Sequence, residues 1–346
     1  MKNNKYLFLC LFVLFTLNQL KAQDKRIYVS RTDTALKIVE KYDNPMRAGY
    51  NIAANIGIDA SLSSPGVFAE LVGIYAPKRF YFSASHAFDF SNNGFTSYND
   101  ETTIPESKLN GYSNTQLCVV FNFKDETVET KVQPTVGTKF IDERISDQSY
   151  NRKVIRFLAY KTDEEIKIRK TKGFGVSLSN LNSNFIQNLG ADSSSGIVKF
   201  QNNPKLTNDF ILPFTTTFIG LRYQASTSSS YNIHYKLSGI DKKKFKTKST
   251  AYRYMAIEAL FAPSINYSES AFYLNSNNNI DQLKVEDVKV NRLGLRVLIQ
   301  SNFYDESKNK VRRKPGIFYN IDFGLRPSVG KIENGLYLKF GLGLSI

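Results

Sequence analysis

The chain has 346 residues, a formal net charge of +15 and 13% aromatic residues, comprising 26 Phe and 20 Tyr without Trp. It has only two cysteines, Cys10 and Cys118, which excludes a disulfide-rich secreted domain. Apolar residues are spread thinly and evenly, so after residue 22 no segment approaches the roughly 18 consecutive apolar residues of a membrane helix.

Residues 1–22 have the features of a secretory signal peptide. Two lysines give a basic start, an apolar run follows, and Ala22 offers a small residue at the cleavage point. The run of about 12 residues is too short for a lone membrane anchor. Cleavage would remove three lysines and lower the net charge from +15 to +12. Residues 23–45 are polar, and we expect them to form a periplasmic lead-in.

Seven segments alternate apolar and polar side chains with a period of two, which is typical of strands with one apolar face. They span residues 50–59, 80–90, 116–123, 173–179, 292–300, 317–326 and 336–346. In the last of them, Leu336, Phe340 and Leu344 fall on one face, whereas Tyr337 and Lys339 fall on the other. A length of about 9–12 residues suits a tilted strand that crosses a bilayer.

Weaker patterns predict further strands, joined by turns and loops. These strands span residues 67–76, 131–141, 151–160, 210–225, 231–238 and 250–263, with a bulge near Phe218 and Ile219 where the apolar set changes face. Pro77-Lys78 and Ser228-Ser229-Ser230 predict short turns, and residues 91–110, 182–209 and 266–287 predict long polar loops.

The predicted fold is all-β: a transmembrane antiparallel β-barrel over residues 46–346. Because bacterial single-chain barrels have even strand numbers, we expect about 12 strands, within a range of about 10–14. Short turns at one end and long loops at the other are the expected asymmetry.

The Lys-Ala-Gln signal ending, the Tyr/Phe-rich alternating strands and the run from Gly335 to Ile346 resemble Bacteroidetes-type outer-membrane β-barrel proteins. The resemblance covers the whole chain in style. It implies a barrel fold and a location in the cell outer membrane, and it implies no activity. Ile346 departs from the aromatic residue that most often ends such chains.

The sequence offers little for catalysis. His86 and His234 are the only histidines, and no His/Cys cluster has metal-site spacing, so we expect no catalytic residues, metal or cofactor. His86 is predicted on an apolar face, and Cys118 is predicted to face the lumen as an inert residue. A barrel enzyme at the outer face, a lipid or peptide hydrolase, is the alternative.

Nine charged residues are predicted to line the lumen, because a lipid-facing charge would cost about 2–4 kcal/mol at mid-membrane. They are Arg253, Arg292, Arg296, Arg326 and Lys339, opposed by Asp59, Asp89, Asp322 and Glu258. If these charges pair across a small lumen, the barrel is a closed structural or accessory component of the envelope. If they line a water-filled path, the barrel is a narrow, porin-like channel with an anion preference.

Basic runs at residues 167–172, 241–248 and 308–314 suggest partners with phosphate groups. Outer-membrane lipids, including lipopolysaccharide, and an envelope protein are the candidates, and solvated loops are an equal alternative. Nucleic acid is not expected, because an exported barrel has little access to it. A soluble secreted β-protein is a third interpretation, and it predicts extraction by carbonate without detergent.

Overall fold

The structure is a computed structural model. It describes residues 29–32, 36–45, 50–60, 66–89, 112–132, 135–147, 150–161, 163–187, 197–201, 210–237, 244–274, 280–306 and 313–345. The predicted signal segment and the predicted loop 91–110 lie outside these residues. Within the described part, no helix is long and apolar enough to cross a membrane.

The described residues form two units. The smaller unit comprises described residues within 29–43, 129–166 and 231–248, and the larger unit comprises those within 44–128, 167–230 and 249–345.

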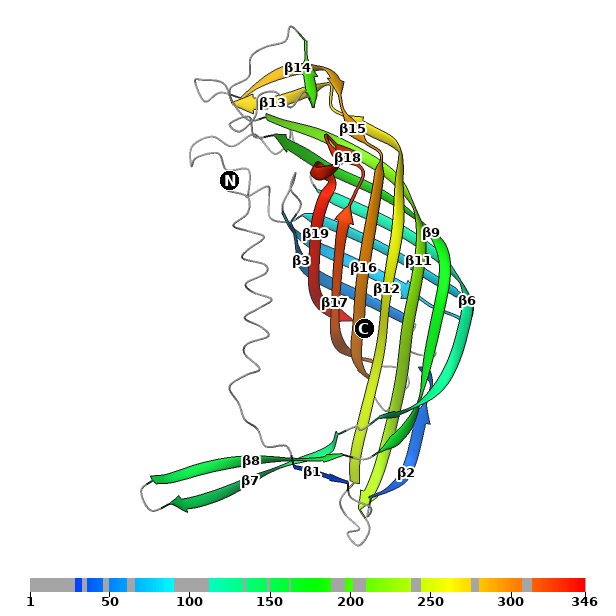
Figure 1. Cartoon of the computed structure of the whole chain (residues 1–346), viewed down its shortest axis with the longest axis vertical. Coiled ribbons are helices and arrows are strands. Elements are labelled where there is room, and N and C mark those ends of the chain that lie inside the picture. Colours follow the sequence, from blue (N-terminus) through cyan, green and yellow to red (C-terminus); the bar gives the residue numbers. More distant parts are fainter. Residues whose placement is uncertain are drawn as a thin grey trace. The chain divides into compact units, whose positions relative to one another are not determined.

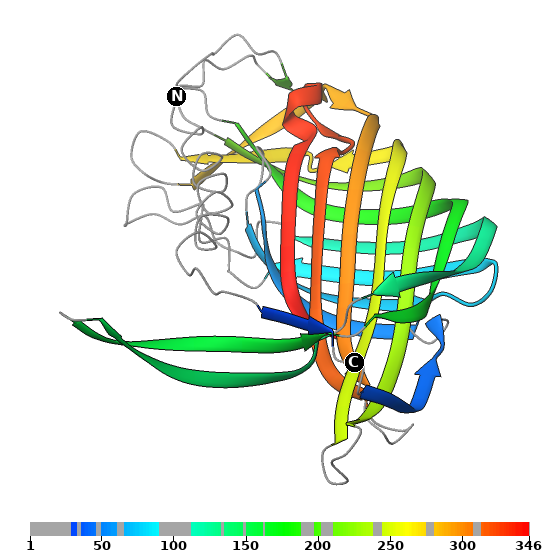
Figure 2. The same ribbon diagram turned by 60° about the horizontal axis from the view of Figure 1, so that its bottom comes forward.

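Ten strands, whose main paired segments lie in the larger unit, close an antiparallel barrel (Figure 1). In ring order they are β3 (Tyr50–Asp59), β4 (Gly66–Tyr75), β5 (Phe80–Asp89), β6 (Ser113–Val132), β9 (Glu164–Gln187), β11 (Phe210–Leu237), β12 (Lys244–Tyr267), β16 (Leu293–Glu306), β17 (Arg313–Leu325) and β19 (Leu336–Ser345). The first and last ring strands, β3 and β19, pair with each other and close the ring. In Figure 2 the red, orange and yellow strands from β19 to β12 run side by side along one wall.

The remaining strands lie outside the ring. β10 (Val198–Phe200), β14 (Ile280–Val288) and β13 (Ser270–Leu274) extend the sheet from the start of β11, and β15 (Val290–Asn291) pairs with β18 (Ser328–Val329), followed by the 3-10 helix η3 (Ile332–Gly335). In the smaller unit, β1 (Val29–Thr32), β8 (Tyr150–Lys161) and β7 (Thr135–Asp147) form a three-stranded sheet, and β2 (Leu36–Asp43) pairs with the end of β11.

The alternation in the sequence becomes an alternation of burial. Along β3 every second residue is buried, and along β19 Tyr337 and Lys339 are buried whereas Leu336 and Phe340 are exposed. The prediction of an all-β barrel with one apolar face per strand is therefore confirmed at the level of the fold.

The ring has ten strands, fewer than the expected twelve and at the lower end of the predicted range. Segments 131–141 and 151–160 became β7 and β8 of the separate three-stranded sheet. Segment 231–238 is the continuation of β11, so the turn predicted at Ser228-Ser229-Ser230 is wrong: these serines lie within that strand. The polar segment 266–287 is also no simple loop, because it contains β13 and part of β14.

The bulge predicted near Phe218 is wrong as well. β11 pairs with β9 without a register shift from Phe210 to Ser229. The apolar set changes face because Phe214 and Phe218 point inward into apolar clusters, whereas Ile219 and Leu221 point outward. The change of face thus marks an apolar layer inside the barrel.

The two ends of the barrel have different connections. One end, which we call the turn end, carries the short β4–β5 turn at 76–79 and the end of β19 at Ser345. The other end, the loop end, carries the longer connections 90–112, 188–209 and 268–292. By strand order the connection 133–163 between β6 and β9, which contains β7 and β8, also belongs to the turn end, so the predicted division into short turns at one end and long loops at the other is only partly seen.

The outer wall is apolar on all ten ring strands. Exposed large apolar residues on it include Ile52, Ile56, Ile58, Leu71, Tyr75, Phe80, Phe82, Leu117, Val119, Phe121, Phe174, Val176, Leu178, Ile219, Leu221, Met255, Ile257, Phe261, Leu293, Leu295, Ile317, Phe323, Phe340, Leu342 and Leu344. We call this set the apolar belt. A continuous apolar surface of this extent is unusual for a water-soluble monomer, so the belt is compatible with a membrane barrel.

Candidate functional site

The interior of the barrel is layered. Along β12, Tyr254 and Ala256 belong to an apolar cluster towards the turn end, Glu258 follows, and Leu260 belongs to a second cluster towards the loop end. Because inward residues alternate along a strand, a layer of charged side chains lies between two apolar layers.

The apolar layers cross the interior from wall to wall. Tyr81 of β5 stacks on Tyr252 of β12 with ring centroids 6.4 Å apart, and it meets Tyr254 edge-on at 5.4 Å. β5 and β12 are not neighbours in the ring. In the second cluster Phe68 of β4 shares the interior with Leu260 of β12. Side chains from non-neighbouring strands therefore meet inside the barrel at both levels.

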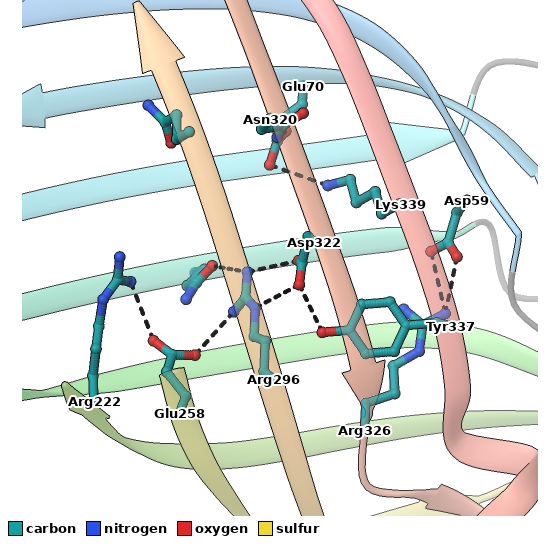
Figure 3. A network of polar contacts seen from close by, with 12 residues as sticks. Asp59, Glu70, Arg222, Glu258, Arg296, Asn320, Asp322, Arg326, Tyr337 and Lys339 are labelled. Carbon is teal, nitrogen blue, oxygen red and sulfur yellow. Dashed lines mark hydrogen bonds and ion pairs between the residues drawn. The ribbon is translucent and has the colours of Figure 1, made fainter. Parts of the chain in front are cut away.

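Arg296 of β16 is the centre of the charged layer (Figure 3). Its guanidinium donates to both oxygens of Asp322 on β17, with Nε–Oδ1 at 2.9 Å and Nη2–Oδ2 at 2.8 Å. It also donates to Glu258 Oε2 at 3.3 Å and to Gln116 Oε1 at 2.9 Å. Tyr337 donates its hydroxyl to Asp322 Oδ1 at 2.7 Å. Five strands are thereby tied together through one buried arginine.

Arg222 of β11 extends this layer. Its Nη1 lies 3.1 Å from Glu258 Oε1, so Glu258 is shared between two arginines. The guanidinium carbon lies near two tyrosine rings that contact each other, 5.6 Å from the centroid of Tyr81 and 5.1 Å from that of Tyr254, which is a favourable cation–π arrangement. Both Arg222 and Glu258 are fully buried.

Two further ion pairs complete the layer, one from Asp59 and one from Glu70. Arg326 Nη2 lies 3.1 Å from Asp59 Oδ2, which also accepts from the Tyr112 hydroxyl at 3.1 Å. Lys339 Nζ lies 3.1 Å from Glu70 Oε1.

The second oxygen of Glu70 is also occupied. It accepts from the side-chain amides of Asn55 at 3.2 Å and Asn320 at 2.8 Å. We call the whole set the interior network; its charged members are Arg222, Arg296, Arg326 and Lys339 with Asp59, Glu70, Glu258 and Asp322. Four cations face four carboxylates, so the interior network has no net charge.

The structure brings six of the nine predicted lumen residues into this network: Arg296, Arg326, Lys339, Asp59, Asp322 and Glu258. Arg253 and Arg292 lie elsewhere. Arg253 is exposed, on the opposite face of β12 from Tyr252 and Tyr254, because the inward positions of this strand are even-numbered. Arg292 is exposed before β16 and donates to the Pro263 carbonyl at 3.2 Å. Asp89 is the last residue of β5, where its backbone pairs with Phe68.

The sequence reasoning missed Glu70 and Arg222. Alternation along β4 could have placed Glu70 inward, because Glu70 lies on the same face of the strand as the buried residues Phe68 and Val72. Arg222 was hidden by the assumed bulge, which reversed the expected faces beyond Phe218. The inward tyrosines had no signal, because they occupy polar positions while packing as apolar residues.

Some buried polar atoms of the interior have no hydrogen-bond partner among the described residues. They include Arg222 Nε and Nη2 and both side-chain amide atoms of Gln224 and Asn302. A buried polar group left without a partner costs about 1–3 kcal/mol, so we expect ordered water at these atoms.

Arg169 of β9 holds a second polar site, at the turn end. It donates to both oxygens of Asp125 at 2.7 and 2.8 Å, and to the carbonyls of Ala76 at 3.1 Å and Pro77 at 3.0 Å. It thus ties the β4–β5 turn to β6. The hydrogen bonds from Arg169 lower the pKa of the Asp125 carboxyl, which lies beyond the apolar belt.

Asp125→Asn should therefore destabilise the barrel by about 1 kcal/mol, less than the roughly 1.5–3 kcal/mol of a buried hydrogen bond to a charged group, because Asp125 is partly exposed to solvent. Because the pKa of Asp125 is lowered in the folded state, this stabilisation is present above the ordinary carboxyl pKa of about 3.9 and is lost as the pH falls through the folded value. Urea unfolding of both proteins at neutral and acidic pH checks this. A difference that persists unchanged in acid would contradict it.

The histidines make local contacts. His86 is exposed, its Nδ1 lies 2.8 Å from Thr115 Oγ1, and its ring stacks on Phe88. His234 Nδ1 lies 3.1 Å from Glu40 Oε2 in the smaller unit. Cys118 is a buried free thiol in the cluster that contains Tyr81. Within the described ranges, no group of three His, Cys, Asp or Glu residues could hold a metal ion.

Comparison with protein-family models, with curated protein sequences and with solved structures gave no match.

Proposed function

We propose that the chain is an outer-membrane β-barrel that serves as a structural or accessory component of the envelope, with a closed interior. The observation that carries this proposal is the interior network, in which every charged side chain has a partner of opposite sign. The membrane location is supported by the apolar belt on all ten ring strands and by the signal segment expected at residues 1–22.

A conducting path is less compatible with this interior. Anion-selective pores present rings of arginine or lysine to water, whereas Arg296 and Arg222 are engaged by carboxylates and are shielded by apolar layers on both sides. Small barrels of about eight strands are filled by side chains, and the cross-barrel contacts of Tyr81 with Tyr252 and Tyr254 support a similar interior here. The proposed role involves no enzymatic step.

We expect the purified protein to be electrically silent in planar bilayers. Its insertion is established separately by heat-modifiable migration on a gel, because a folded barrel resists dodecyl sulfate until it is boiled. Stepwise, anion-biased conductance of the inserted protein would overturn the closed interior. Extraction of the protein from membranes by carbonate without detergent would overturn the membrane location itself.

A further inference from the structure

Three basic side chains lie on the outer wall at the turn end, just beyond the apolar belt. Lys170 and Lys172 of β9 and Arg253 of β12 are all exposed. On β9 they precede Phe174, Val176 and Leu178, the belt residues of that strand. A charged residue on an otherwise apolar wall is tolerable only where the wall meets headgroups or water, so these residues mark the edge of the hydrocarbon layer.

The register places the three cations around small residues. Lys172 pairs with Ala225 and Lys170 pairs with Thr227 of β11. β12 is the next strand in the ring, and the hydroxyls of Ser230 and Thr250 lie 3.1 Å apart. Three residues further along each antiparallel strand, Thr227 and Arg253 are therefore neighbours. The result is a shallow row of small side chains flanked by cations on both sides, which we call the basic row.

The charges of the basic row are available to a ligand. Within the described part of the chain, Lys170 and Lys172 form no ion pair, and Asp125 on the neighbouring strand β6 is engaged by Arg169. The guanidinium carbon of Arg253 lies 4.7 Å from the ring centroid of Phe303. This stacking orients the guanidinium while leaving its N–H groups at the edge free to donate.

An amphipathic ligand fits what surrounds the basic row. Phe174 and Tyr223 lie directly beside it with ring centroids 5.3 Å apart, and Leu221 and Met255 continue the apolar wall towards the loop end. A phosphate could therefore meet the cations while acyl chains lie along the belt.

We propose that the basic row binds the phosphate of an anionic glycerophospholipid in the membrane leaflet at the turn end. This inference rests on the proposed membrane function. It assigns a lipid class and a position to the electrostatic partner. Three cations for which the described residues offer no paired carboxylate complement a headgroup of net negative charge.

The test uses the full mature chain in nanodiscs of phosphatidylcholine that contain a minority of spin-labelled phosphatidylglycerol. Electron paramagnetic resonance measures the fraction of labelled lipid that the protein immobilises. Each basic residue near a membrane surface changes association with anionic lipid by about fivefold. We expect Lys170→Gln, Lys172→Gln and Arg253→Gln together to abolish the preference for phosphatidylglycerol over spin-labelled phosphatidylcholine.

The matched control removes the same charge elsewhere. Lys199, Lys284 and Lys289 are exposed on or beside β10 and β14 at the loop end, and their triple replacement by Gln should leave the preference unchanged. Equal loss in both triple variants would show a general charge effect and overturn the site. Saturable binding of inorganic phosphate in detergent, lost in the first variant, would identify a free-anion site and overturn the lipid assignment.

The two proposals fail in different ways. If the wild type enters nanodiscs and resists dodecyl sulfate before boiling but shows no preference for phosphatidylglycerol, the inference about the basic row is wrong. The proposed membrane function is then unaffected. If the wild type does not enter the bilayer at all, the proposed membrane function is wrong.

Discussion

Replacement of Arg296 by alanine should lower the free energy of unfolding by about 3–5 kcal/mol, because removal of one partner of a buried ion pair leaves the other charge uncompensated. Here two carboxylates are affected at once. Asp322 loses two hydrogen bonds from the guanidinium, and Glu258 is left with Arg222 alone. The gel temperature at which the folded band disappears, and urea unfolding in lipid vesicles, measure the loss.

Arg292→Ala is the matched control, since it removes an exposed arginine that precedes the same strand and should change stability by less than about 0.5 kcal/mol. A second variant separates charge from packing. When Arg296→Met is combined with Asp322→Asn alone, Glu258 keeps its pair with Arg222 and no buried charge is left without a partner, so much of the stability should return. If Arg296→Ala changes the free energy of unfolding as little as Arg292→Ala does, the interior network does not contribute measurably to the stability of the fold.

Gly57→Ala should destabilise the barrel by about 1–3 kcal/mol, the usual cost of overpacking. Gly57 is an inward position of β3 at the closing seam. A Cβ there would overlap the Phe340 carbonyl oxygen and the Phe68 ring, and it would lie 2.8 Å from the Gly341 Cα. The ring cannot move freely, because the Lys339 ammonium lies 4.1 Å from its centroid.

Gly73→Ala provides the comparison within the same sheet. The nearest atom to a Cβ at Gly73 is the Ala84 carbonyl oxygen, 3.9 Å away, which is ordinary contact. We expect this change to be neutral or slightly stabilising, because alanine restricts the unfolded chain more than glycine does. Urea unfolding of both variants checks the pair. If Gly57→Ala proves as mild as Gly73→Ala, the close packing of the Phe68 ring on the seam is wrong.

The barrel fold could be predicted from strands whose two faces differ in polarity, because one face points into the barrel and the other points outward. β3 and β19 each have one apolar and one polar or small face, and a period of two can only come from strands. The same reasoning placed Arg296, Asp322 and Lys339 inward without any knowledge of the partners that they contact.

The number of ring strands was less predictable, because a strand outside the ring can show the same alternation of apolar and polar residues as a strand within it. Segments 131–141 and 151–160 were predicted as weaker strands of the ring, yet β7 and β8 pair with each other, and β8 also pairs with β1. Conversely, Ser228-Ser229-Ser230 has turn composition and lies inside β11, where it continues a strand of 28 residues. Local composition does not determine how far a strand extends when its partners continue beside it.

The interior network was only partly predictable, since a sequence shows faces and not cross-barrel neighbours. Parity identifies Glu258 as inward. It cannot show that two arginines from different strands share that carboxylate, or that Tyr81 reaches across to Tyr254. Whether the inward charges pair with one another or line a water-filled path depends on these contacts. The sequence alone was therefore compatible with both a closed barrel and a channel.

The seam between β3 and β19 has a consequence for biogenesis. The ring is completed by its first and last strands, and until β19 docks both β3 and β17 present bare peptide edges. Such edges are not viable in hydrocarbon, where every amide needs a partner. If the barrel spans a membrane as proposed, an open ring would not be stable within the bilayer, and insertion would have to coincide with closure of the ring or use machinery that pairs the open edges.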